Sequence, residues 1–139
     1  MSAPPAPPER VETGSLYRLV PNWLTHWDYD RGVPEPRAFR KDGDIGVSML
    51  RSDRITLEGI FQRKPNLKEF AVCEILVADL IADRDVWIEV DPDDDFGDAH
   101  VLVMGITKRR IDWLRDLGAR RIINRPGPAK PPSSEYDPD

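Results

Sequence analysis

Residues 70–77 read Phe70-Ala71-Val72-Cys73-Glu74-Ile75-Leu76-Val77, and this stretch decides the fold class. Glu74 is its only charged residue, and the other positions are apolar. A short apolar run of this kind is typical of an inner strand whose two faces are both covered. The stretch therefore predicts an inner strand of a sheet.

Other segments have the composition and alternation that indicate further strands. The first, 15–20, is followed by Pro21, which cannot continue an inner strand. Turn residues at 41–44 (Lys-Asp-Gly-Asp) precede a second predicted strand at 45–50. The remaining predicted strands are 38–40, 86–90, 100–104 and a short closing strand at 120–124.

Two helices are predicted from similar starting sequences. Thr56 and Thr107 are suitable N-cap residues, and an isoleucine lies on either side of each in the spacing of a hydrophobic staple. Pro65 ends the first helix, whereas Gly118 is expected to follow the second helix as its C′ residue. Residues 78–83 are expected to form one further helical turn.

Strand runs interrupted by two helices predict an α+β fold with one mixed, mostly antiparallel sheet and two packed helices. The predicted domain is 15–125. The flanking stretches 1–14 and 126–139 are rich in proline and lack apolar periodicity, so both are predicted to be disordered tails. An alternative interpretation is that such a segment is the ligand of an aromatic groove.

The composition indicates one globular domain: 139 residues, 40% of them hydrophobic and 32% charged. A chain of this length can bury a core without a disulfide or a metal. The single cysteine, Cys73, can form no internal disulfide, which suggests a reducing compartment. The start of the chain lacks the features of a secretory signal, and no apolar run is long enough to span a bilayer. A cytoplasmic protein without membrane attachment is therefore expected.

Charge is distributed unevenly along the chain. The net charge of −5 disfavours general binding to nucleic acid, because that requires a positive surface. Residues 79–98 contain nine acidic residues and one basic residue, whereas residues 108–125 contain seven basic and two acidic residues. This polarity predicts a surface that recognises a charged partner.

The acidic loop 91–98 has carboxylates at the first three ligand positions of an EF-hand calcium loop. The glycine that such a loop requires would fall at Phe96, and its final glutamate would fall at Leu102. No metal site is therefore expected, and the loop is predicted to be a solvated docking surface. The residues predicted to contact a basic partner there are Asp93, Asp94 and Asp95.

Two further pairs are candidates for partner binding. Trp23 and Trp27 would share one face of a helix, either as an exposed interface pair or as core residues. Arg109 and Arg110 lie in the first turn of the second predicted helix, where positive charge opposes the helix dipole. An acidic loop of the chain, an acidic partner or a phosphate is expected to compensate this charge.

Short matches follow the chain in a fixed order: Tyr17-Arg18, Ala38-Phe39, Val47-Ser48, Asp91-Pro92, Ala99-His100 and Gly105. In this order and spacing, over roughly 90 residues, the chain resembles a loose group of small, uncharacterised bacterial proteins. The resemblance implies the domain boundaries and a bacterial source. It implies no activity.

An enzymatic alternative rests on Arg18, Ser48 and Glu74, which fall on three predicted strands. The set is similar to that of enzymes that cleave NAD and transfer ADP-ribose. In those enzymes an arginine holds the dinucleotide, a serine shapes the site and a glutamate stabilises the developing oxocarbenium charge. His100, beside the acidic loop, is either a general base or ligand contact, or a strand-end residue bonded to the loop backbone.

The sequence contains no glycine-rich phosphate loop, paired-cysteine motif, metalloprotease motif or nucleophile elbow. The leading hypothesis is therefore a non-catalytic interaction or accessory module without a cofactor, which binds a larger protein partner through a charge-polarised surface. A small NAD-consuming, ADP-ribosyltransferase-like enzyme is the second hypothesis. The third is nucleic-acid binding through the C-terminal arginines Arg109, Arg110, Arg120, Arg121 and Arg125. The oligomeric state stays open.

Overall fold

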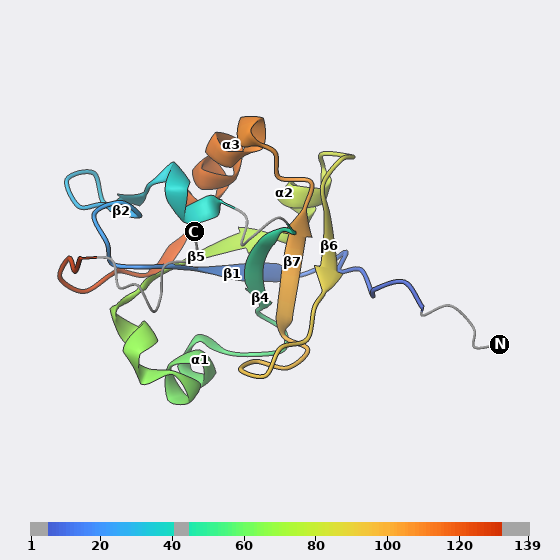
Figure 1. The fold of residues 1–139 in the computed structure, drawn as a ribbon, viewed down its shortest axis with the longest axis horizontal. Helices are drawn as coiled ribbons and strands as arrows, with labels where there is room; N and C mark the ends of the chain where they lie inside the picture. Colours follow the sequence, from blue (N-terminus) through green and yellow to red (C-terminus); the bar gives the residue numbers. More distant parts are fainter. Residues whose placement is uncertain (1–5, 41–44, 132–139) are drawn as a thin grey trace.

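Figure 1 shows the fold in a computed structural model, which describes residues 6–40 and 45–131. Six strands form one sheet in the order β6-β7-β4-β1-β5-β8, with every neighbouring pair antiparallel. The strands are β1 (Ser15–Val20), β4 (Val47–Arg51), β5 (Ala71–Leu76), β6 (Trp87–Val90), β7 (His100–Met104) and β8 (Ile122–Asn124). A small second sheet pairs β2 (Trp27–Asp28) with β3 (Val33–Pro34). The predicted α+β class is confirmed.

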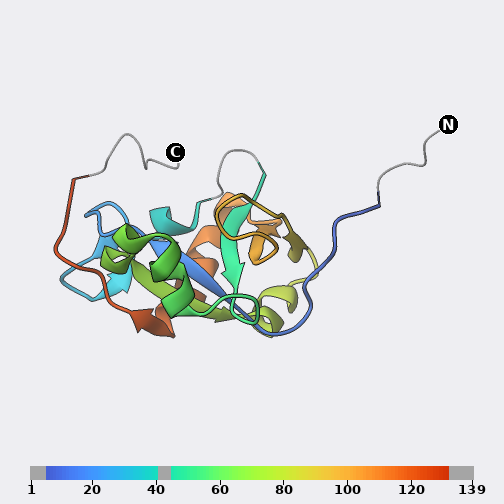
Figure 2. The same ribbon diagram turned by 90° about the horizontal axis from the view of Figure 1, so that it is seen from below.

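Helices cover both faces of the large sheet (Figures 1 and 2). On one face, here called the α3 face, lie α3 (Lys108–Ala119) and the 3-10 turn η1 (Pro36–Phe39). On the other, the α1 face, lie α1 (Leu57–Arg63) and the 3-10 turn η2 (Pro65–Glu69). The short helix α2 (Val77–Ile81) follows β5 directly, where one helical turn was expected.

The alternation of β1 divides the core between these two layers. Leu16 and Val20 are buried with Leu114 of α3, whereas Tyr17 and Leu19 pack with the cluster around Ile60 of α1. Successive side chains of a strand point to opposite faces, so one strand can serve both clusters. Arg18 points to the α3 face and is only 8% exposed, which makes it a buried charge.

The inner strand predicted at residues 70–77 is confirmed as β5, which lies between β1 and β8. Its residues Ala71, Val72 and Cys73 are fully buried. Glu74 is opposite Tyr17 of β1 and therefore belongs to the α1 face. The predicted closing strand at 120–124 is present as β8, shortened to three residues.

Two local predictions are wrong, and both errors come from the same contact. Residues 38–40 are not a strand, because Pro36 begins the 3-10 turn η1 and Phe39 is buried against α3. Gly118 does not follow α3 but lies inside it. A Cβ at Gly118 would come within 2.6 Å of Phe39 Cζ, so the glycine lets the ring pack directly on the helix backbone.

Parts of both predicted tails are in contact with the domain. Glu9 O accepts a hydrogen bond from Val90 N (2.8 Å), and Val11 N donates to Ile88 O (3.0 Å), along the open edge of β6. At the other end, Lys130 N donates to Asn22 O (2.9 Å). Ordered structure therefore extends beyond 15–125, while residues 1–5, 132–139 and the predicted turn 41–44 lie outside the described residues.

Candidate functional site

A cleft opens on the α3 face, where η1 meets the beginning of α3. Its volume is about 660 Å³. We call it the α3 cleft, and the residues that line it are Pro36, Arg37, Arg40, Ile106, Thr107, Lys108, Ile111 and Asp112. A volume in this range suits a bound segment or a small molecule.

The contact between Phe39 and Gly118 sets the position of η1 beside α3. Phe39 is fully buried, and Ala38 beside it is also fully buried. With these two side chains facing the core, the neighbouring arginines Arg37 and Arg40 are left at the surface. The burial of Ala38 and Phe39 therefore places Arg37 and Arg40 at the rim of the α3 cleft.

The α3 cleft combines an apolar floor with basic side chains. Ile106 is 6% exposed, and Pro36 and Ile111 are half-buried. Arg40 and Lys108 are exposed, and Arg37 is half-buried. Asp112 is the one carboxylate among the described residues that line the cleft. This composition favours a ligand with negative charge and some apolar surface.

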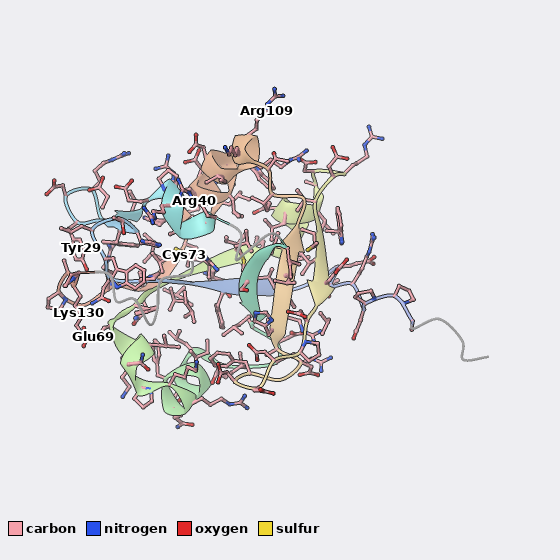
Figure 3. All side chains as sticks on the ribbon, in the orientation of Figure 1. Tyr29, Arg40, Glu69, Cys73, Arg109 and Lys130 are labelled. Carbon is pink, nitrogen blue, oxygen red and sulfur yellow. The ribbon has the colours of Figure 1, made fainter. Side chains whose placement is uncertain are left out.

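Arg109 adds to the positive charge near the α3 cleft. It projects from the first turn of α3 into solvent (Figure 3), as part of a shallow surface depression with Thr107, Lys108 and Arg110. Within residues 6–40 and 45–131, neither Arg109 nor Arg40 or Lys108 forms an ion pair. The predicted partner-binding residue Arg109 is thus accessible to a partner.

Arg110, the other predicted member of this pair, is engaged within the molecule. Its Nε donates to Asp83 Oδ2 at 2.8 Å, its Nη2 lies 3.2 Å from Asp85 Oδ2, and its Nη1 donates to Gly105 O at 3.0 Å. Hydrogen bonds from the Asp85 backbone N–H and then from Arg110 hold the pKa of Asp83 below its ordinary value. The charge of Arg110 at the start of α3 is therefore compensated by the chain itself.

The acidic loop 91–98 is also tied to the rest of the molecule. Asp95 forms an ion pair with Lys64 (2.7 Å), and Asp98 forms one with Arg54 (2.8 Å). Asp93 accepts a hydrogen bond from Phe96 N, which closes the loop, whereas Asp94 is exposed. Within the described ranges, no group of three or more histidine, cysteine or acidic residues is arranged to hold a metal ion.

Trp23 and Trp27 are core residues. They are 3% and 2% exposed, so they offer no aromatic surface to a partner, and the predicted interface role requires correction. The tight turn between them, with Trp27 N donating to Trp23 O at 2.9 Å, turns both side chains inward. His26 lies against Trp23 with the two rings edge to face, 4.9 Å between centroids.

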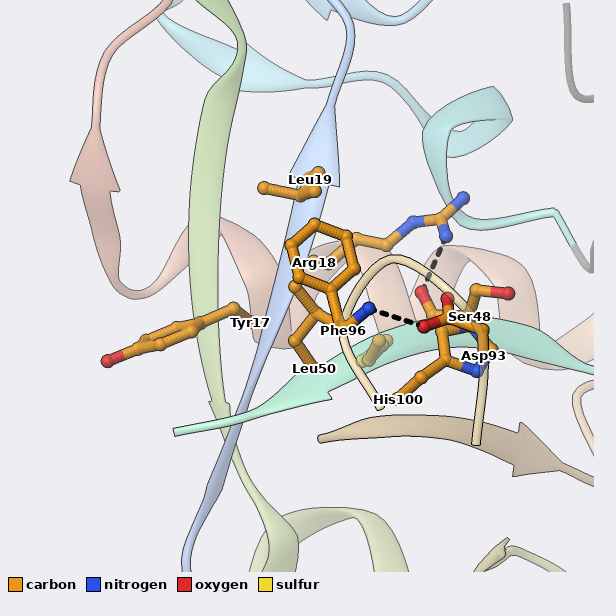
Figure 4. A pocket seen from close by; sticks show the side chains of 9 residues that line it. Tyr17, Arg18, Leu19, Ser48, Leu50, Asp93, Phe96 and His100 are labelled. Carbon is orange, nitrogen blue, oxygen red and sulfur yellow. Dashed lines mark hydrogen bonds between the residues drawn. The ribbon is translucent and has the colours of Figure 1, made fainter. Parts of the chain in front are cut away.

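Three of the four residues in the enzymatic alternative line one pocket (Figure 4). Arg18, Ser48 and His100 border a cavity of about 200 Å³ together with apolar side chains of β1 and β4. β1 and β4 pair only at Leu16–Arg51 and Tyr17–Leu50. Beyond that point Arg18 connects β1 to β4 and to η1, because its guanidinium donates to Ser48 O (2.7 Å) and to Ala38 O (2.8 Å).

The fourth residue, Glu74, does not join this pocket. It accepts a hydrogen bond from Ser15 Oγ (2.7 Å) and forms an ion pair with Arg121 (2.6 Å). The His100 Nδ1–H donates to Asp91 O at 2.7 Å, the loop-backbone bond that was one of its two interpretations. A pocket of about 200 Å³ is below the usual range for ligand sites, and a dinucleotide does not fit it.

The sequence interpretation did not single out Arg37, Arg40 or Lys108. Lys108 was counted in the basic region, but η1 was expected to be a strand. About seventy residues separate η1 from α3 in the sequence, and neither segment alone signals that they meet. The local sequence pattern of either segment therefore could not predict the α3 cleft.

Comparisons with protein families, curated proteins and solved structures find no match for this chain. The site is therefore interpreted from its own residues. None of the helices in the described part of the chain is both long and apolar enough to cross a membrane.

Proposed function

We propose that the protein is a non-catalytic interaction module of a bacterial system that works in the cytoplasm. Its larger protein partner presents an acidic segment, which enters the α3 cleft. One observation carries this proposal: a cleft of about 660 Å³ gathers Arg37, Arg40 and Lys108 around an apolar floor. In a chain whose net charge is −5, such a concentration of positive charge marks a distinct surface.

The composition of the α3 cleft defines the chemistry of the bound segment. Carboxylates of the partner would meet Arg40 and Lys108 at the rim, and an apolar side chain would cover Ile106 and Ile111. Each exposed ion pair contributes only about 0.2–1 kcal/mol, so the charges mainly speed association and select the partner. The apolar floor supplies the contact area that holds the segment in place.

A protein segment suits this surface better than a nucleic acid. Arg120, Arg121 and Arg125 follow the end of α3, roughly 18 Å from its beginning. Arg121 is also paired with Glu74. The predicted arginines therefore do not form the one continuous positive surface that nucleic-acid binding requires.

The test combines charge reversal with a defined probe. A fluorescein-labelled peptide of alternating glutamate and leucine is titrated into the wild-type chain and into the double variant Arg40→Glu/Lys108→Glu, with anisotropy as the readout. We expect the double variant to bind at least about tenfold more weakly. Wild-type binding should also weaken as the salt concentration rises from about 50 to about 300 mM.

The matched control reverses two exposed charges elsewhere, Arg84→Glu and Arg120→Glu, with the same change in net charge. It should bind like the wild-type chain. Equal losses in both double variants would mean that only net charge matters, and the α3 cleft would then not be the binding surface. Affinity capture from the source bacterium, with the same three chains, then identifies the partner as the protein lost only with the cleft variant.

A further inference from the structure

Residues 126–130, Pro126-Gly127-Pro128-Ala129-Lys130, are bound along the domain as an extended segment. Gly127 N donates to Glu69 O at 2.9 Å, and Tyr29 Oη donates to Gly127 O at 2.8 Å. Tyr29, Glu69 and Lys130 mark this region in Figure 3. We call the receiving surface the Asn22 surface and define it by Asn22, Trp23, Tyr29 and Glu69.

Asn22 is the centre of this surface. It is only 2% exposed, and its Nδ2 donates to Pro128 O at 2.8 Å. Its main-chain O accepts from Lys130 N at 2.9 Å, and Trp23 and Lys130 form a parallel β-bridge. The segment therefore both covers the Asn22 amide and bonds it, and a buried amide without such a partner would be costly.

The contacts define which ligand fits. All four hydrogen bonds join the Asn22 surface to main-chain atoms of the segment, so the backbone path is recognised and not long side chains. A Cβ at Gly127 would meet only the carboxylate end of the exposed Glu69 side chain, which can turn aside, so the main-chain path is recognised more than the glycine itself. Flanking prolines hold a peptide extended before it binds, which lowers the entropy lost on binding.

The bound segment can leave without disturbing the sheet. It follows β8, which ends at Asn124, and Pro128, Ala129 and Lys130 are exposed. Its contacts are therefore made at the surface, and no core cluster includes it. A neighbouring segment on the same chain competes at an effective concentration in the millimolar range.

We propose that the Asn22 surface is a peptide-recognition site, and that a Pro-Gly-Pro segment of a partner protein can replace residues 126–130. The ligand is an extended, proline-containing peptide that is bound through its main chain. This site is separate from the α3 cleft and does not depend on the function proposed for it.

The test uses the full chain and a labelled peptide with the sequence of residues 125–130, Arg-Pro-Gly-Pro-Ala-Lys. The double variant Gly127→Val/Lys130→Pro weakens the docking of the chain's own segment, because it removes the N–H that bonds Asn22 O and makes the Glu69 side chain move aside. Peptide binding is followed by anisotropy and by the NMR signal of the Asn22 side-chain amide. We expect the variant to bind the peptide at least about tenfold more tightly than the wild-type chain.

Two controls make the result specific. Adding Tyr29→Phe to the double variant should weaken binding severalfold by removing the bond to Gly127 O. The peptide has no acidic side chain, so Arg40→Glu/Lys108→Glu should leave its binding unchanged and separate this test from that of the α3 cleft.

The proposal is overturned if the peptide binds neither chain at about 1 mM, or if adding Tyr29→Phe to the double variant leaves the binding unchanged. It is also overturned if the wild-type chain forms dimers that Gly127→Val/Lys130→Pro abolishes, because the occupant would then be a second copy of this chain. Binding that moves the Asn22 amide signal only in the variant supports it.

Discussion

Arg110 shows how one side chain can join two loops to a helix. It bonds Asp83 and Asp85 before β6 and Gly105 after β7, and thereby ties the start of α3 to the edge of the sheet. Bonds from the Asp85 N–H and then from Arg110 lower the pKa of Asp83 from its ordinary value of 3.8. A carboxylate whose pKa is lowered by folding stabilises the folded state at pH values above its unfolded pKa.

This linkage predicts a pH-dependent effect of Arg110→Met. At about pH 7 the variant should unfold at a lower urea concentration than the wild-type chain, because Asp83 loses its charged partner. As the pH falls below about 3.8 and then through the lowered pKa of folded Asp83, the carboxylate becomes protonated and the difference in urea midpoint should shrink. Urea unfolding followed by tryptophan fluorescence at both pH values measures this.

Arg109→Met is the control for that experiment, because Arg109 is exposed and forms no ion pair within the described residues. Its urea midpoint should match that of the wild-type chain at both pH values. If the Arg110→Met difference stayed constant from about pH 7 to about pH 3, the Asp83 linkage would be refuted.

Cys73 illustrates the opposite case, a titratable group that folding keeps neutral. Burial raises the pKa of its thiol to about 12, so it is uncharged at neutral pH. In that state it packs as a small apolar side chain of β5. Cys73 therefore contributes to the stability of the core.

At the scale of elements, the two main helices begin with the same residue type but differ in how their N-termini are satisfied. In α1 the Thr56 side chain accepts a hydrogen bond from Gly59 N at 3.0 Å. In α3, Thr107 occupies the N-cap position with extended backbone, yet its side chain makes no cap bond. The predicted N-cap of α1 is confirmed. For α3, Thr107 is at the predicted N-cap position, but the expected side-chain hydrogen bond is absent.

The difference predicts unequal costs for the same substitution. Thr56→Ala should lower the free energy of unfolding by about 1 kcal/mol, because Gly59 N loses its acceptor. Thr107→Ala should change it by less than about 0.5 kcal/mol, because no cap bond is lost. Urea unfolding of the two single variants provides the comparison, and equal costs would contradict the assignment of the caps.

At the scale of the whole molecule, a segment near each end of the described chain covers an exposed part of the fold. Residues 9–11 cover the open edge of β6, and residues 126–130 cover the Asn22 surface near β2. An uncovered edge strand is a template for pairing with another chain. The N-terminal segment therefore protects the sheet edge as well as adding Val11, 8% exposed, to the core on the α3 face.

Val11→Pro tests this protection. Proline removes the N–H that bonds Ile88 O (3.0 Å) and displaces a buried side chain, so the free energy of unfolding should fall by about 1–3 kcal/mol. Sedimentation velocity should also show more self-association, because the β6 edge becomes available. Glu12→Pro, at an exposed position, is the control and should leave both measurements near the wild-type values.

Much of the architecture follows from patterns of a few residues. The apolar run of β5, the alternation of β1 and the threonines before α1 and α3 place those elements close to their observed bounds. These features depend on side-chain periodicity and capping, which act between residues near in sequence. The α+β class follows from their order along the chain.

The candidate site follows from contacts between segments distant in sequence. Phe39 packs on Gly118, which makes η1 a 3-10 turn beside α3 and brings Arg37 and Arg40 next to Lys108. The same kind of long-range packing buries Trp23 and Trp27 and separates Glu74 from Ser48. Residues near in sequence determine the strands, helices and caps. Which charged side chains lie together at the surface depends instead on how distant segments pack across the sheet, because that packing is set by the shape of the whole core.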